Sequence, residues 1–204
     1  MMITNWTKNL HKFKNSYIGY YDVPEYVMSF IKENDLKNNP ANEKLAGHIK
    51  EEYFIKNVNE NVENFFIEKA FEEPNIKYIQ DINILDRDCP LKLKNLWINY
   101  QKKYEFNPIH DHSGVLSFII FVKIPYDLNN EENLFKVKDK LASKLNFITI
   151  SANGKVFTVP IDVDKSFENK MLMFPASLKH CVYPFYTSDD YRITVSGNLV
   201  FKTK

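Results

Sequence analysis

The sequence predicts a mainly β domain buttressed by helices in its first third. Helical patterns of apolar residues occupy the chain up to residue 74, and short β-rich segments separated by polar turns follow from Pro74 onward. Regularly spaced short strands are typical of a β-sandwich or barrel. Asn153-Gly154, between two of these segments, is a strong signal for a β-hairpin turn. The length suits one domain, so we expect residues 1–204 to combine a mostly helical buttress (1–74) with a β core (75–204).

The first part of the chain predicts one edge strand and two helices. We expect the edge strand at residues 15–21. Residues 23–34 predict a helix with Asp22 as its N-cap and Pro24 in its first turn. Residues 59–72 predict a second helix. Its apolar side chains share one helical stripe, which we expect to pack on the sheet: Val62, Phe65, Phe66 and Ala70.

Seven segments of the second part have the composition of strands. They are residues 91–101, 114–124, 147–151, 155–160, 171–174, 181–185 and 193–201. A charged stretch at residues 129–144 separates the second segment from the third. We expect this stretch to be an exposed insertion or a short helix.

The composition argues against several classes of partner. The chain has 27 Lys and Arg against 26 Asp and Glu, so we expect neither nucleic acid nor a membrane surface as a partner. Cys89 and Cys181 do not make a disulfide framework, which favours a reduced, cytoplasmic setting. Neither a secretory signal nor an apolar run of about 18 residues is visible in the sequence.

Two of the five histidines stand two residues apart at the start of the most strand-like run, residues 114–124. Successive side chains of a strand point to opposite faces, so we expect His110 and His112 to point the same way and Asp111 to point away. Two imidazoles on one face can clamp a metal ion. The pair alone is weak support, because surface loops produce such pairs by chance.

Two features downstream strengthen the metal hypothesis. His180, about seventy residues later, is a candidate third ligand. Arg192 follows twelve residues after it, and the even spacing places Thr194 on the same face of the last predicted strand. A guanidinium group offers a planar fork that matches a carboxylate, and the threonine hydroxyl can add a further hydrogen bond.

These residues stand within a set of short phrases that recur together in one family. The phrases are Leu45-Ala46-Gly47, Trp97-Ile98-Asn99-Tyr100-Gln101, Asn107-Pro108, His110-Asp111-His112-Ser113-Gly114, Phe174-Pro175 and Arg192-Ile193-Thr194. Together they resemble the Fe(II)/2-oxoglutarate-dependent oxygenases, more narrowly a group found in phages and marine bacteria. The resemblance covers roughly residues 41 to 204. It implies a jelly-roll (double-stranded β-helix) core, and the cytoplasm of the host cell if the gene is phage-encoded.

The resemblance also implies a reaction and a role for each site residue. His110, His112 and His180 would be the catalytic metal ligands for Fe(II). Arg192 and Thr194 would bind the distal carboxylate of the cosubstrate 2-oxoglutarate, and Tyr100 would touch the same cosubstrate. The enzyme would be a dioxygenase, most simply a hydroxylase, coupling decarboxylation of 2-oxoglutarate to oxidation of an unknown substrate. That substrate would be a peptide, a protein or a small molecule.

The sequence departs from the family at one position and leaves alternatives open. The usual triad is His-x-Asp…His, whereas His112 stands where the carboxylate is expected. A β-bulge at Asp111 could turn its carboxylate inward and displace one histidine. Two other functions also remain: a cupin-type metalloenzyme with three histidines that does not use 2-oxoglutarate, and a non-catalytic jelly-roll module that retains a metal ion.

Overall fold

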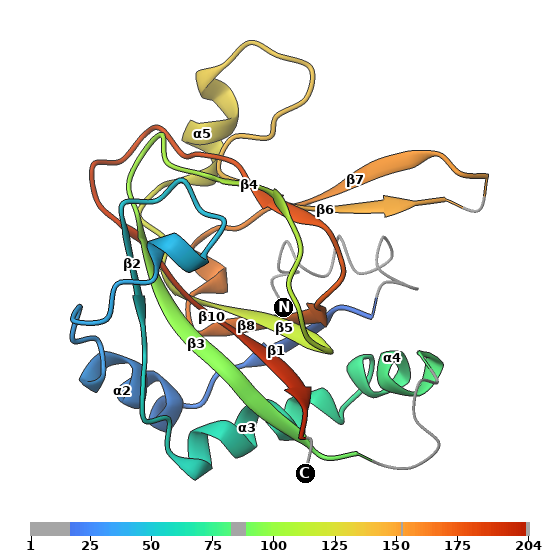
Figure 1. Ribbon diagram of the computed structural model, residues 1–204. Helices are drawn as coiled ribbons and strands as arrows, with labels where there is room; N and C mark the ends of the chain where they lie inside the picture. Colours follow the sequence, from blue (N-terminus) through green and yellow to red (C-terminus); the bar gives the residue numbers. More distant parts are fainter. Residues whose placement is uncertain (1–16, 83–88, 152, 203–204) are drawn as a thin grey trace, which may run out of the picture.

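Two antiparallel sheets form the body of the protein (Figure 1). The computed structural model describes residues 17–82, 89–151 and 153–202. The larger sheet contains, in spatial order, β1 (Gly19–Asp22), β8 (Lys170–Pro175), β5 (Leu116–Lys123), β10 (Arg192–Phe201), β3 (Leu91–Gln101) and β2 (Glu51–Phe54). The smaller sheet contains β4 (Asn107–His110), β9 (His180–Val182), β6 (Leu145–Ile150) and β7 (Val156–Ile161). This mainly β, two-sheet architecture confirms the predicted jelly roll.

Helices cover the outer face of the larger sheet (Figure 1). They are α2 (Glu25–Glu33), α3 (Glu60–Ala70) and α4 (Asn75–Asp81). Asn59 caps α3, because its side-chain oxygen accepts a hydrogen bond from the N–H of Val62 at 3.0 Å. Phe66 of α3 is fully buried and stacks on Phe118 of β5, with ring centroids 4.2 Å apart. The apolar stripe predicted for residues 59–72 therefore packs on the sheet.

The inner faces of the two sheets enclose a second apolar cluster. Phe147 of β6 packs against Phe174 of β8, with ring centroids 5.0 Å apart, and both side chains are buried. This cluster joins the sheets across their inner faces. The insertion between β5 and β6 carries α5 (Leu128–Leu134), so part of the charged stretch is helical. Short 3₁₀ turns occur at η2 (Asn42–Lys44) and η3 (Lys165–Phe167).

The hairpin predicted at Asn153-Gly154 joins β6 to β7. Gly154 has φ +81°, a left-handed conformation that glycine adopts without steric cost, and its N–H donates to the carbonyl of Ser151 at 2.8 Å. Among the described residues, no helix has the length and apolar character needed to span a bilayer.

Some local predictions were wrong or incomplete. Pro24 occupies the N-cap of α2 without a side-chain hydrogen bond, so Asp22 is not the cap. Asp22 instead ends β1, because the edge strand continues through it and its carboxylate pairs with Lys170. The strand predicted at residues 15–21 lies partly outside the described residues, and its visible part is shifted into β1. No sequence pattern predicted β2, β4 or α4.

Candidate metal and cosubstrate site

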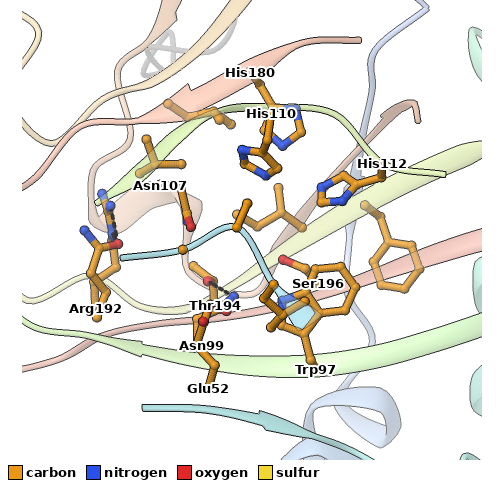
Figure 2. Close-up of a pocket in the computed structure, with 18 of the residues that line it drawn as sticks. Glu52, Trp97, Asn99, Asn107, His110, His112, His180, Arg192, Thr194 and Ser196 are labelled. Atoms are coloured by element: carbon orange, nitrogen blue, oxygen red, sulfur yellow. Dashed lines mark hydrogen bonds between the residues drawn. The ribbon is translucent and has the colours of Figure 1, made fainter. Parts of the chain in front are cut away.

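A pocket lies between the sheets, with polar side chains of the larger sheet on one wall. Three cross-strand pairs of β3 and β10 supply most of that wall: Gln101 with Arg192, Asn99 with Thr194, and Trp97 with Ser196. Alternate residues of a strand share a face, so pairing in register brings all six side chains to the inner face. The three histidines face this wall across the pocket (Figure 2).

The smaller sheet contributes the histidine cluster. His110 of β4 and His180 of β9 are directly paired across the ladder. His112 lies two residues beyond the end of β4, where its backbone N–H donates to the carbonyl of Ala176 at 2.9 Å. The ring nitrogens available as ligands all lie within 4.8 Å of one another. The three side chains thus converge as predicted, although His112 is held by this loop contact and not by a continuing strand.

Hydrogen bonds fix the tautomers of two of these histidines. Nδ1 of His110 lies 2.7 Å from the carbonyl oxygen of Pro108, and Nδ1 of His180 lies 2.9 Å from that of Leu178. A carbonyl can only accept, so each Nδ1 carries the hydrogen and each Nε2 keeps its lone pair. Outer hydrogen bonds of this kind orient histidine ligands in metal sites.

Burial keeps the histidine cluster neutral. Burial lowers the pKa of His180 to about 3, and the nearby imidazoles of His110 and His112 act in the same direction. The pKa of His112 is lowered to about 4, mainly by burial and to a smaller extent by the nearby imidazole of His110. Metal binding requires the neutral imidazole, so these groups need lose no proton near pH 7. Three neutral nitrogen donors suit Fe(II), and also zinc, copper or nickel.

Asp111 does not join the cluster. Its carboxylate is exposed and pairs with Lys179 at 2.8 Å, on the side of the chain away from the pocket. The bulged alternative in which Asp111 replaces a histidine is therefore not formed. Within the part of the chain that the structure describes, the group of residues able to hold a metal ion here is His110, His112 and His180.

Arg192 lies at one end of the pocket, buried with 3% of its surface exposed (Figure 2). Its Nε and Nη2 donate to the side-chain oxygen of Gln101, and Nη1 donates to the carbonyl of Ser143 at 2.8 Å. Weaker bonds reach the Tyr126 hydroxyl at 3.2 Å and the Tyr183 carbonyl at 3.4 Å. All these acceptors are neutral. Among the described residues, no carboxylate forms an ion pair with this guanidinium.

Of the two other residues predicted to contact the cosubstrate, Thr194 lines the pocket and Tyr100 does not. Thr194 lines the pocket and accepts a hydrogen bond from Nδ2 of Asn99 at 3.1 Å. Tyr100 does not line the pocket: its hydroxyl donates to Asp35, and Lys37 Nζ lies 3.7 Å from its ring centroid. The structure does not bring Tyr100 to the pocket, because Asn99 and Gln101 face inward and alternation turns the residue between them outward.

Several residues of the pocket were missed at the sequence level. Asn107 and Glu52 line the pocket on either side of Gly47, where an added Cβ would lie 2.6 Å from Oδ1 of Asn107 and 2.7 Å from Oε1 of Glu52. Polar residues at alternate positions of the strand 91–101 could have indicated Asn99 and Gln101 as inward-facing. No local signal indicates Glu52, because its strand becomes a pocket wall only by pairing with β3.

Comparisons with known proteins place these features in one family. The family model described as "Putative 2OG-Fe(II) oxygenase" matches residues 95–198, just over half of the chain. The matched range contains all three histidines, Arg192 and Thr194. No curated protein gives a match.

Solved structures with similar folds share little sequence with this chain. A prolyl-4-hydroxylase from Pseudomonas putida is 11% identical, with 96% of this chain and 98% of that chain covered and a TM-score of 0.52. An oxidoreductase of the 2OG-Fe(II) oxygenase family from Burkholderia pseudomallei is 9% identical (93% and 88% covered, TM-score 0.48). HygX from Streptomyces hygroscopicus, solved with nickel and 2-oxoglutarate, is 11% identical (96% and 87% covered, TM-score 0.47).

The Pseudomonas structure supports the fold, and the family match carries the assignment. The three clustered imidazoles supply a donor set that suits the iron of this family. The chain belongs to the 2OG-Fe(II) oxygenases and is an Fe(II)- and 2-oxoglutarate-dependent dioxygenase.

Proposed function

We propose that His110, His112 and His180 hold the iron, that Arg192 and Thr194 bind the distal carboxylate of 2-oxoglutarate, and that the enzyme hydroxylates a substrate entering the same pocket. The observation that carries this proposal is the buried guanidinium of Arg192, which has no carboxylate partner among the described residues and shares one pocket with the histidine cluster. A buried charge is costly unless it is paired, so such a site favours an anionic ligand.

The present contacts of Arg192 indicate how a carboxylate would be received. Gln101 holds the Nε side of the guanidinium, and Ser143 holds Nη1. The 3.4 Å bond from Nη2 to Tyr183 is the longest of the set and the easiest to exchange. A carboxylate oxygen in place of this carbonyl would make a charge-assisted hydrogen bond, which is about twice as strong as a neutral one.

Thr194 extends the same binding surface. Its hydroxyl accepts from Asn99, which leaves its own O–H free to donate toward the pocket. Arg192 and Thr194 lie two residues apart on one face of β10 and can therefore contact one ligand. The side chains of Trp97 and Leu145 add apolar surface to the pocket, which helps to exclude water from the reacting groups.

The overall reaction would be a balanced four-electron reduction of O₂. When bound, Fe(II) supplies the redox chemistry by which O₂ and 2-oxoglutarate convert a substrate C–H bond to C–OH, with succinate and carbon dioxide as co-products. The protein residues hold the ligands, orient the cosubstrate through Arg192 and shield the reacting groups. Their contribution is positioning and a preorganised electrostatic environment.

Anaerobic calorimetric titration of the Mn(II)-loaded protein with 2-oxoglutarate tests these roles. We expect metal-dependent binding in the wild type and none in His180→Ala. Arg192→Gln should weaken binding roughly 100-fold while metal affinity survives, because a charge-assisted hydrogen bond is lost. Lys123→Gln is the control: it removes a surface cation, paired with Asp190 at 2.5 Å, from the same sheet.

Each unfavourable outcome points to a different conclusion. Metal binding without any 2-oxoglutarate binding would reject the cosubstrate site and favour the three-histidine cupin mechanism. Unchanged 2-oxoglutarate affinity in Arg192→Gln, with folding verified by circular dichroism, would reject the role of Arg192 alone. Binding of neither ligand would leave a jelly-roll module without this activity.

A further inference from the structure

Glu52 is a buried carboxyl group on the pocket wall that the proposed reaction does not use. Only 1% of its surface is exposed, and it lines the pocket from the edge strand β2, directly paired with Asn99. Figure 2 shows it below the histidines, on the same side as Asn99 and Thr194, while Arg192 lies at the end of the pocket. Its position places it within reach of a molecule bound between the two sheets.

The protein provides Glu52 with little compensation for burial. Its one described side-chain hydrogen bond comes from Nδ2 of Asn42, at 3.5 Å, and the same Nδ2 donates to the carbonyl of Ile49 at the much better distance of 2.7 Å. No cation among the described residues lies within ion-pair distance of its carboxylate. The charged group that affects its carboxyl is the like-charged Glu105.

Another glutamate of the same chain illustrates how a structural carboxylate is satisfied. Glu131 is also 1% exposed. It accepts from the backbone N–H of Tyr186 at 3.0 Å, from the N–H of Thr187 at 2.7 Å and from the hydroxyl of Thr187 at 2.6 Å. Glu131 therefore fastens α5 to the loop that contains Tyr186 and Thr187, and it needs no ligand. Glu52 has equal burial without these donors, so a purely structural role explains it poorly.

The other ligands of the site cannot satisfy Glu52. The group able to hold the metal ion contains the three histidines and not this carboxylate. The cosubstrate 2-oxoglutarate is a dianion, which Glu52 would repel and Arg192 would attract. The remaining occupant of the pocket is the substrate. A carboxylate is an acceptor, and a desolvated one favours a positively charged donor.

We propose that Glu52 recognises a cationic nitrogen of the substrate, a protonated amine or a guanidinium, and so determines substrate class. Gly47 supports this arrangement, because a Cβ there would lie 2.7 Å from the Glu52 carboxylate and would press on it. The inference rests on the proposed function, since it assumes that the substrate and 2-oxoglutarate share this pocket. Glu52 then aligns the substrate through the positive charge of the substrate nitrogen, and the reacting C–H bond of the substrate faces the histidines.

A pair of matched probes tests the charge preference without knowledge of the substrate. Pentylamine and 1-pentanol have the same carbon chain and differ in charge at one end. Their binding to Zn(II)-loaded protein with 2-oxoglutarate is measured by ligand-observed NMR, a readout independent of turnover. We expect the wild type to bind pentylammonium roughly tenfold more tightly than pentanol, and Glu52→Gln to bring the ratio close to one.

Two further variants make the result specific. Glu51→Gln removes a carboxylate from the same strand but on the opposite side, where Glu51 pairs with Lys37 at 3.3 Å; it should keep the amine preference. Glu52→Asp keeps the charge and should retain a reduced preference. Equal binding of the two probes by the wild type, including binding of neither, would overturn the proposal without any variant. So would an amine preference that persists in Glu52→Gln.

The same protein samples separate this inference from the proposed function. A wild type that binds 2-oxoglutarate but shows no amine preference would reject the role of Glu52 alone. A wild type that prefers the amine in a Glu52-dependent manner but binds no 2-oxoglutarate would retain the cation site and reject the oxygenase roles proposed for the pocket.

Discussion

His110 and His180 are cross-strand partners in the β4–β9 ladder, and each donates its Nδ1–H to the backbone carbonyl two residues earlier in the chain. The same local bond thus occurs on both sides of the pair. It fixes the ring orientation and leaves both Nε2 atoms free to ligate a metal ion. The backbone therefore holds two candidate metal ligands in the orientation that metal binding would require.

The identity of the third ligand can be tested by comparing neighbours. We expect His112→Ala to lower Fe(II) or Mn(II) affinity by roughly 100-fold, because one of three ligands is lost. Asp111→Asn should leave metal affinity nearly unchanged, since that carboxylate is exposed and pairs with Lys179. Calorimetric metal titration of the two variants measures this difference. The reverse order of affinities would identify Asp111 as the ligand.

Substitutions on the two faces of the larger sheet should differ in their effect on cosubstrate binding. Thr194→Val removes the hydroxyl that lines the pocket, so we expect 2-oxoglutarate affinity to fall about tenfold. Tyr100→Phe removes a hydrogen bond to Asp35 on the other face, so stability should fall by about 1 kcal/mol while cosubstrate affinity stays unchanged. Titration with 2-oxoglutarate and urea unfolding separate the two effects. A loss of 2-oxoglutarate affinity in Tyr100→Phe but not in Thr194→Val would show that Tyr100, and not Thr194, contacts the cosubstrate.

The fold and the candidate site were predictable from the sequence only in part. The bounds of the strand 91–101 were predicted correctly, and the three imidazoles of the His-x-His…His order lie together in the structure. The facing of Tyr100 was missed because alternation fixes only relative orientation, and no residue of that strand was independently known to face the pocket. Glu52 was missed because a short edge strand gains its environment from a partner forty-seven residues away.

Glu131 should be among the most sensitive positions outside the pocket. Replacement by Gln replaces one acceptor oxygen by a donor that faces the N–H groups of Tyr186 and Thr187, so stability should fall by about 2–3 kcal/mol. Glu132→Gln is the matched control. It should cost less, because its partner Lys144 keeps a second carboxylate, Asp162, at 2.6 Å. Urea unfolding of both variants gives the comparison, and equal losses would contradict the anchoring role.

The burial of Glu52 predicts a pH-dependent stability of the metal-free protein. Burial, followed by the nearby Glu105, raises the pKa of Glu52 from its ordinary value of 4.5 to about 7. The folded protein therefore holds this proton more tightly than the unfolded chain. The stability that protonated Glu52 contributes is present below pH 4.5 and is lost as the pH rises through 7. The loss amounts to about 3 kcal/mol.

Urea unfolding between pH 4.5 and 8 should show this effect as a growing stability advantage of Glu52→Gln over the wild type. Glu51→Gln should show no such growth over this range, because the Tyr191 hydroxyl, followed by Lys37, lowers the pKa of Glu51, so the stability that its carboxylate contributes is lost only below pH 4.5. A stability difference between wild type and Glu52→Gln that is independent of pH would show that the carboxyl of Glu52 is not desolvated.

The division of the site between two sheets has a consequence for selectivity. His110 and His180 come from the smaller sheet and Arg192 from the larger one, so the packing of the two sheets, which includes Phe147 on Phe174, determines the separation between them. On the proposed binding mode, a keto acid must bridge that separation with its own carbon chain. On that binding mode we expect 2-oxoglutarate to fit best, and we expect oxaloacetate, one carbon shorter, and 2-oxoadipate, one carbon longer, to bind less tightly. Selection for the five-carbon acid would then follow from the separation between the two sheets.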